Sequence, residues 1–193
     1  MMVEPYKRCV LPRMKTSKLK FSALLLLLAV CSTSRAASAA DSNWFYFEVD
    51  ATRARVTVAE TEFNPVLPRY KLGVFITQGI MLEAHYSGSG DDTVDNSNVE
   101  IENISAAYLR LDSGIRSTMR MYVILGSAET KLNVRGSGGA TAGTDTYKDF
   151  SWGLGIEDRI WSKHTLLTLE YTEYYNHDEI IISGVSLGFK FEY

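Results

Sequence analysis

Three polar residues have side chains suited to acyl transfer. His85 and Ser87 are two residues apart, which places both on one face of a strand, and Glu102 follows in the next predicted strand. A base, a hydroxyl nucleophile and an orienting carboxylate are what ester hydrolysis needs. However, Ser87 opens a Ser-Gly-Ser-Gly segment that is typical of a turn. We therefore predict that the chain is not an enzyme, with His85, Ser87 and Glu102 as weak candidates for catalysis.

Metal, thiol and cofactor chemistry have little support in the sequence. His177, Asp178 and Glu179 are consecutive and offer ligand atoms, but adjacent polar residues between two strands are usually solvated turn residues. Both cysteines, Cys9 and Cys31, lie within the first forty residues. We expect no metal site, no disulfide and no cofactor.

The first forty residues have the pattern of a secretory signal peptide. A basic segment precedes an apolar run at residues 21–30, and small residues follow at 36–40. Cleavage after Ala39 or Ala40 fits equally well, and Met14 is an alternative start. An uncleaved anchor is the competing interpretation, although the run is short for a helical span. Residues 1–40 are therefore predicted to direct Sec export and to be removed, leaving one domain at 41–193.

The remaining chain is acidic and contains no long apolar run. It has 13 basic and 22 acidic residues, a net charge of −9, which argues against nucleic acid as a partner. A helical span needs about 20 consecutive apolar residues. Membrane-spanning helices are therefore not expected in the mature chain.

Apolar and polar residues alternate throughout the mature chain. Near the C-terminus, Val185, Leu187 and Phe189 are apolar, whereas Ser186 and Gly188 between them are not. This period of two is typical of a strand with one apolar face. Eight strands are predicted, within residues 45–52, 70–77, 80–87, 99–111, 119–126, 150–157, 165–172 and 184–193.

The connections between these strands alternate between short and long. Those at 77–79, 112–114 and 158–163 are short, whereas 53–68, 88–98 and 129–149 are long; the last one, around Asn176-His177-Asp178, is brief. An even number of strands with short turns at one end is typical of an antiparallel up-and-down transmembrane β-barrel, in which closure satisfies every backbone polar group. Eight aromatic residues near predicted strand ends suit its interfacial girdles: Trp44, Tyr70, Tyr86, Trp152, Trp161, Tyr171, Tyr174 and Tyr175.

The charged residues of the strands have the parity that faces the interior of such a barrel. An eight-stranded barrel is just wide enough for side chains to fill it, so we expect a structural plug of ion pairs, with a narrow channel as the alternative. The predicted network comprises Glu83, Arg110, Arg120, Glu157, Glu170 and Lys190. The other charged or titratable residues placed inside are Glu48, Asp50, Lys71, His85 and Glu102.

The C-terminus carries a more specific signature. Ser186, Gly188, Phe191 and Tyr193 resemble the terminal assembly signal of outer-membrane proteins, a polar residue and a glycine followed by two spaced aromatics. The mature chain thus resembles the small outer-membrane β-barrel family of Gram-negative bacteria, which includes the OmpA transmembrane domain, OmpX and Ail. The resemblance implies eight strands, both termini in the periplasm, and insertion by the barrel-assembly machinery with periplasmic chaperones.

The resemblance also sets the functional expectation, a structural or surface-interaction role in the cell outer membrane. A monomer is expected, with outer-membrane lipid and lipopolysaccharide as partners. Three alternatives stay open: a lipid A acyl hydrolase, because lipid A deacylases have a similar His-x-Ser pair; a narrow porin-like channel; and a soluble periplasmic binding barrel. Acidic residues mark the predicted loops: Glu60, Glu62, Asp91, Asp92, Asp95 and Asp145.

Overall fold

The computed structural model describes residues 44–58, 61–94, 97–113, 119–135, 141–177 and 180–193, so the predicted signal peptide lies outside the described residues. No helix within these ranges is long and apolar enough to cross a membrane. The strands are β1 (Phe45–Val58), β2 (Thr61–Phe63), β3 (Val66–Thr77), β4 (Ile80–Ser87), β5 (Gly90–Val94), β6 (Ser97–Asp112), β7 (Met119–Arg135), β8 (Thr141–Arg159), β9 (Thr165–His177) and β10 (Ile180–Glu192).

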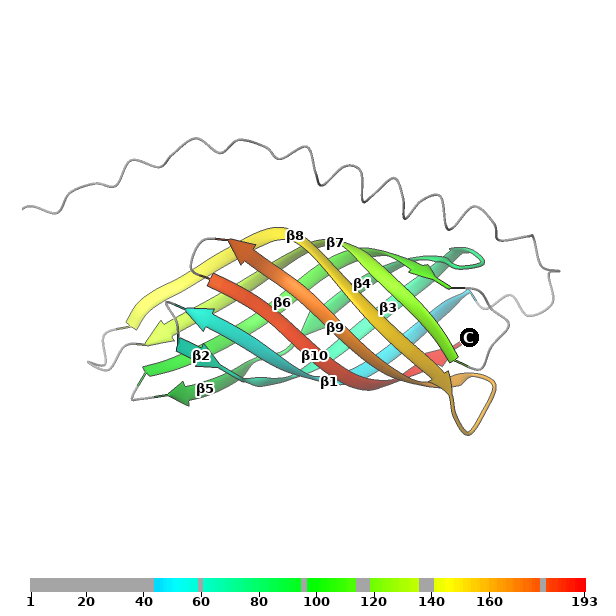
Figure 1. Ribbon diagram of the computed structural model, residues 1–193, viewed down its shortest axis with the longest axis horizontal. Helices are drawn as coiled ribbons and strands as arrows, with labels where there is room; N and C mark the ends of the chain where they lie inside the picture. Colours follow the sequence, from blue (N-terminus) through cyan, green and yellow to red (C-terminus); the bar gives the residue numbers. More distant parts are fainter. Residues whose placement is uncertain (1–43, 59–60, 95–96, 114–118, 136–140, 178–179) are drawn as a thin grey trace, which may run out of the picture. The chain divides into compact units, whose positions relative to one another are not determined.

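Eight long strands form a closed antiparallel barrel, as the sequence predicted (Figure 1). Consecutive long strands pair around the wall, and β10 closes it by pairing with β1 from Tyr46–Glu192 to Val58–Ile180. The short strands β2 and β5 extend the wall by pairing with β1 and β6. We call the end that holds Phe45 and Tyr193 the terminal end and the opposite end the projecting end.

Burial alternates residue by residue along β1 near the terminal end. On β1 the side chains of Phe45, Phe47 and Val49 are exposed, whereas those of Tyr46 and Glu48 are buried. A sheet that exposes apolar residues and buries charged ones is suited to lipid outside and a polar interior. The outward apolar residues form a continuous band that includes Val66, Tyr70, Leu72, Val74, Leu82, Tyr86, Leu109, Met121, Phe150, Leu154, Ile156, Leu169, Tyr171, Val185, Leu187 and Phe189.

Two of the predicted girdle residues lie elsewhere. Tyr174 is buried inside the barrel, and Tyr175 packs partly against the buried apolar cluster described below. The prediction was wrong for Tyr174 because it placed the residue by its nearness to a strand end, whereas its parity on β9 directs it inward.

The long connections are largely strands rather than irregular loops, which corrects the sequence interpretation. Segment 53–68 contains the end of β1, all of β2 and the start of β3, and segment 88–98 contains β5. Segment 129–149 continues β7 to Arg135 and begins β8 at Thr141. The alternation there is weak in apolar contrast because the outward residues are polar. In Figure 1, β6, β7 and β8 reach further at the projecting end than β9, β10 and β1.

At the projecting end the interior is apolar. Val99, Ile101 and Leu132 from β6 and β7 pack in one cluster with Val56 from β1 and Ile182 from β10. The outward residues of β1 change in the same region from apolar to Arg53 and Arg55. In this region, as in a water-soluble protein, apolar side chains face inward and charged side chains face outward. The apolar cluster fills the barrel beyond the polar interior.

Tyrosine rings cover glycines inside the barrel. Tyr46 pairs with Gly73 across β1 and β3, and Tyr122 pairs with Gly155 across β7 and β8. A Cβ atom at either glycine would overlap the tyrosine ring. These two rings can lie flat on the wall only because the facing residue lacks a side chain.

The first prediction concerns this packing. We expect Gly155→Val to lower the free energy of unfolding by about 1–3 kcal/mol, because the Tyr122 ring must leave its place in a filled interior. The measurement is urea unfolding of the refolded protein in detergent micelles, followed by tryptophan fluorescence. Ala107→Val is the matched control, since Ala107 points outward from the wall. Equal unfolding midpoints for the two variants would contradict the role of the Tyr–Gly pair.

Candidate functional site

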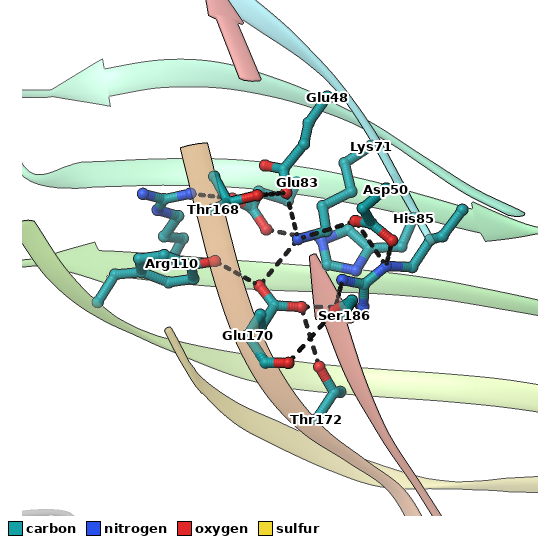
Figure 2. Close-up of polar contacts among 12 residues, drawn as sticks. Glu48, Asp50, Lys71, Glu83, His85, Arg110, Thr168, Glu170, Thr172 and Ser186 are labelled. Atoms are coloured by element: carbon teal, nitrogen blue, oxygen red, sulfur yellow. Dashed lines mark hydrogen bonds and ion pairs between the residues drawn. The ribbon is translucent and has the colours of Figure 1, made fainter. Parts of the chain in front are cut away.

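Lys71 lies at the centre of one group of buried ion pairs (Figure 2). Its Nζ is 2.9 Å from Glu48 Oε1, 3.0 Å from Glu170 Oε2 and 3.5 Å from Asp50 Oδ2. Arg69, one inward position away on β3, donates from Nε to Asp50 at 2.9 Å and lies 2.9 Å from Glu170 Oε1. Strands β1, β3 and β9 are thus joined through their inward side chains.

Arg110 organises a second group nearer the terminal end. Its guanidinium lies 3.2 Å from Glu83, 2.6 Å from Asp112 and 2.6 Å from Glu157. Glu157 also accepts from Lys190 at 2.8 Å. Arg120 completes the group, with Nη2 at 2.7 Å from Glu157 and 2.6 Å from Glu192.

Tyr122 connects the two groups, and Tyr46 adds contacts within the Arg110 group. Tyr122 donates its hydroxyl to Glu170 at 2.8 Å, and the Arg110 guanidinium lies 3.6 Å from the centre of its ring. Tyr46 donates to Glu83, and the Lys190 ammonium lies 4.4 Å from its ring. The interior is therefore one connected polar network, in which aromatic faces as well as carboxylates offset the buried cations.

The structure buries all six residues of the predicted network and pairs each of them. It adds three members that the sequence analysis missed: Arg69, Asp112 and Glu192. Arg69 shares the inward parity of Lys71 and Asp112 that of Arg110, so parity would have found them had the predicted strands extended further.

The three weak catalytic candidates do not form a site. His85 Nε2 lies 2.7 Å from Glu83 Oε2, on its own strand, and its ring packs at 4.6 Å from that of Tyr108. Ser87 is buried, and its hydroxyl has no hydrogen-bond partner among the described residues. Glu102 is half-buried beside a bulge in β6 and accepts from Thr144 at 2.9 Å.

The expectation that Glu102 points into the interior was wrong. The register of β6 against β7 shifts between Ile101 and Asn103, and this extra residue changes the parity on either side of Glu102.

Of the suggested metal ligands, only His177 lies within the described residues. Its Nε2 is 2.7 Å from Asp149 Oδ2, so it pairs with β8. The described part of the chain holds no group of three residues arranged to bind a metal.

The four residues of the C-terminal signature occupy both faces of β10. Ser186 and Gly188 point inward; Ser186 bonds to Arg69, and Gly188 allows close approach of Asp50 on β1. Phe191 is half-buried, and Tyr193 is exposed and stacks on Phe45 at 5.3 Å between ring centres. The signature thus lies along the seam where β10 closes the barrel.

Among the described residues, the hydrogen-bonded wall has a gap at the projecting end. The ladder between β8 and β9 stops at Trp152–Glu173, although β8 begins at Thr141 and β9 continues to His177. Side chains bridge the first part of the gap, where the rings of Tyr147 and Tyr175 are 5.2 Å apart. Residues Thr141–Lys148, which include Tyr147 at their lower end, form what we call the β8 edge.

The chain matches the family model described as outer membrane protein beta-barrel domain over residues 23–192. Comparison with curated proteins gives no match. Neisserial surface protein A is similar in structure, with a TM-score of 0.65 and 15% identity over 77% of this chain and 97% of that one.

Two further solved structures show the same fold. Ail of Yersinia pestis, in complex with the heparin analogue sucrose octasulfate, gives a TM-score of 0.60 and 12% identity over 79% of this chain and 100% of its own. OprG of Pseudomonas aeruginosa gives 0.56 and 8% over 78% and 96%.

The second prediction tests the interior network. We expect Arg110→Met to lower the free energy of unfolding by about 3–5 kcal/mol, because three buried carboxylates lose their shared cation. Urea unfolding in micelles measures the effect. Arg159→Met, at an exposed position of β8, is the control and should change stability by less than about 0.5 kcal/mol. A similar small change for Arg110→Met would show that the ion pairs do not hold the barrel.

Proposed function

Because the chain belongs to the outer membrane protein β-barrel family, we propose that it is a non-enzymatic surface protein that binds an extended segment of a partner protein along the β8 edge. The main support for this proposal is that the β8–β9 ladder ends at Trp152–Glu173, whereas β8 continues to Thr141. A strand with an unpaired side offers backbone donors and acceptors that another extended chain can pair with.

Local hydrogen bonds indicate which amides point to this open side. The Phe150 N–H donates to the Asp149 side chain at 2.7 Å, and the Ser151 hydroxyl donates to the Glu173 carbonyl at 2.5 Å. Side chains thus satisfy backbone groups of β8 and β9 next to the last ladder pair. Because alternate amides of a strand face the same side, the N–H groups of Lys148 and Thr146 lie on the open side with that of Phe150.

Charge favours a basic partner. Among the described side chains of β5–β8 beyond the apolar band, seven carboxylates accompany two lysines. This excess of negative charge would repel an anionic ligand such as sucrose octasulfate, which is found in complex with Ail. The carboxylates are Asp91, Asp92, Glu100, Glu102, Glu129, Asp145 and Asp149, and the lysines are Lys131 and Lys148.

A second copy of the chain fits the edge less well. Two barrels in one membrane point the same way, so their β8 strands run in the same direction and are not presented for antiparallel pairing. The proposed state of the barrel is therefore monomeric, with the edge available to a chain from outside the cell.

The interior favours neither the channel nor the lipid A hydrolase. Arg69, Lys71, Arg110 and Lys190 are fully buried and paired, so a water-filled path would have to break several ion pairs. His85 and Ser87 point into this interior rather than toward lipid, where an acyl substrate would lie. These positions favour a closed, non-catalytic barrel.

The third prediction tests the β8 edge. We expect Thr146→Pro to fold normally, because proline removes an N–H that faces the open side, and to abolish binding of an added strand. The probe is a ten-residue peptide that alternates valine or threonine with lysine. Hydrogen exchange should show that the peptide protects the amides of Thr144 and Thr146 in the wild type and that it protects no amide of the variant's β8 edge.

One control variant and one measurement on cells complete this test. Tyr147→Pro should assemble poorly, because its N–H belongs to the ladder with β7. A fluorescent form of the peptide should label intact cells that carry the wild type. Protection elsewhere in the barrel, or peptide binding that survives Thr146→Pro, would contradict the proposal.

The fourth prediction separates the proposal from lipid A hydrolysis. Ser87→Ala should leave the lipid A acyl pattern of expressing cells unchanged in a mass spectrum. It should also leave stability nearly unchanged, because the Ser87 hydroxyl has no hydrogen bond to lose. A gain of one acyl chain in the variant strain would establish the hydrolase instead.

A further inference from the structure

Two side chains of β8 beside the gap in the wall point toward the interior of the barrel. Tyr147 pairs with Thr130 on β7, and Asp149 pairs with Ala128; both of these β7 residues are buried. Directly opposed residues of neighbouring strands share one face of the sheet. Tyr147 and Asp149 therefore face inward, and both are half-buried.

The facing part of β9 also directs its side chains inward. Tyr175 pairs with Ile182 on β10, which is fully buried, and His177 shares the face of Tyr175 because it lies two residues further along the strand. Each side of the gap thus carries an aromatic ring and a polar group on the inner face of the wall, Tyr147 with Asp149 on β8 and Tyr175 with His177 on β9.

His177 occupies a position that suits a cation. Its Nε2 lies 2.7 Å from Asp149 Oδ2, and its ring meets that of Tyr175 at 5.4 Å between centres. A carboxylate beside an aromatic ring attracts cations. Imidazole side chains lose their charge around neutral pH, whereas lysine and arginine keep theirs. The chain therefore fills this position with its least strongly charged kind of basic side chain.

Asp149 has no permanently charged partner among the described residues. Its Oδ1 accepts from the Phe150 N–H at 2.7 Å, and its Oδ2 contacts His177. Lys148, the next residue of β8, has the opposite parity and faces Glu129 on β7. Within the described ranges, no lysine or arginine forms an ion pair with Asp149. This half-buried carboxylate can thus accept a stronger cation than the chain gives it.

An extended segment that pairs with the open side of β8 would pass between these two sets of side chains. Its residues point alternately outward and inward. The inward ones would lie between Tyr147 and Tyr175 and beside Asp149. Such a segment must separate His177 from Asp149, which leaves a half-buried carboxylate without a cation unless the segment supplies one.

We propose that the partner segment is anchored by a lysine or arginine that takes the place of His177 on Asp149. This inference rests on the proposed function of the β8 edge, and it adds the residue that selects the partner. Asp149 favours segments with an inward-facing cation over segments with a neutral residue there. His177 is the internal competitor that holds the carboxylate while no partner is bound.

The test is a double-mutant cycle on the full mature protein, refolded in detergent micelles. The probe is the peptide that alternates valine or threonine with lysine, together with variants in which each lysine in turn is replaced by glutamine. Fluorescence anisotropy measures their affinities for the wild type and for Asp149→Asn. We expect one lysine replacement to weaken binding to the wild type about tenfold and to leave binding to Asp149→Asn unchanged, because the two groups form one ion pair.

Glu129→Gln is the matched control for loss of a negative charge. Glu129 lies on β7 in the same part of the barrel, but its parity directs it outward. This variant should show the same tenfold effect of the lysine replacement as the wild type. All variants should keep the heat-dependent electrophoretic shift of a folded barrel.

A second measurement tests the competitor. His177→Ala should bind the unmodified peptide more tightly than the wild type, by up to about fivefold, the factor that corresponds to an exposed ion pair. Asn176→Ala, at the neighbouring exposed position of β9, is the control and should bind like the wild type. Unchanged or weaker binding to His177→Ala would show that His177 does not compete for Asp149.

Failure of this inference is distinct from failure of the proposed function. If every lysine replacement has equal effects on the wild type and on Asp149→Asn, while the peptide still protects the amides of Thr144 and Thr146, the β8 edge binds strands but Asp149 is not the anchor. If the unmodified peptide protects neither amide in the wild type, the proposed function is wrong and the anchor is wrong with it.

Discussion

The closure of β10 onto β1 is the contact on which the rest of the structure depends. In lipid, backbone groups at a free strand edge would lack partners, so a sheet can cross only when its first and last strands pair. Thirteen ladder pairs from Tyr46–Glu192 to Val58–Ile180 provide that closure. Closure also fixes the register of the wall, and a shift of one residue would turn every charged side chain toward lipid. The Lys71 and Arg110 groups oppose that shift because each joins several strands.

The same alternation has two physical meanings along one barrel. Within the apolar band, the interior is polar because the outside is lipid. Beyond Ala51 the outside is water, so outward positions become charged and inward positions become apolar, as Arg53 and Val56 show. The barrel is thus filled by ion pairs at one level and by packed apolar side chains at the other. Both fillings keep water out, by pairing charges in the first and by excluding polar groups in the second.

Sequence alone predicted the closed eight-stranded barrel and most interior residues, because a period of two persists wherever one face meets lipid. It failed where that contrast is weak. At the projecting end, polar outward residues made β5 and the extensions of β7 and β8 look like loops. A single bulge displaced Glu102 from the interior, and no local signal distinguishes a bulge from regular pairing. Arg69 and Asp112 were missed because the predicted strands stopped one residue short of each, whereas Glu192 shares the polar face of its strand with Lys190 but was not counted among the interior charges.

The position of the proposed binding edge follows from where the membrane ends. An unpaired strand side would be unfavourable in lipid, so the gap between β8 and β9 can exist only beyond Trp152, where water or a partner satisfies the backbone. An outward arginine would be equally unfavourable within the band, and Arg53 appears on β1 at the first position beyond it. The border of the band therefore separates residues that serve folding from residues that are available for recognition. Because the described interior is packed with buried side chains, this border and the strands beyond it are the places where the barrel can bind other molecules.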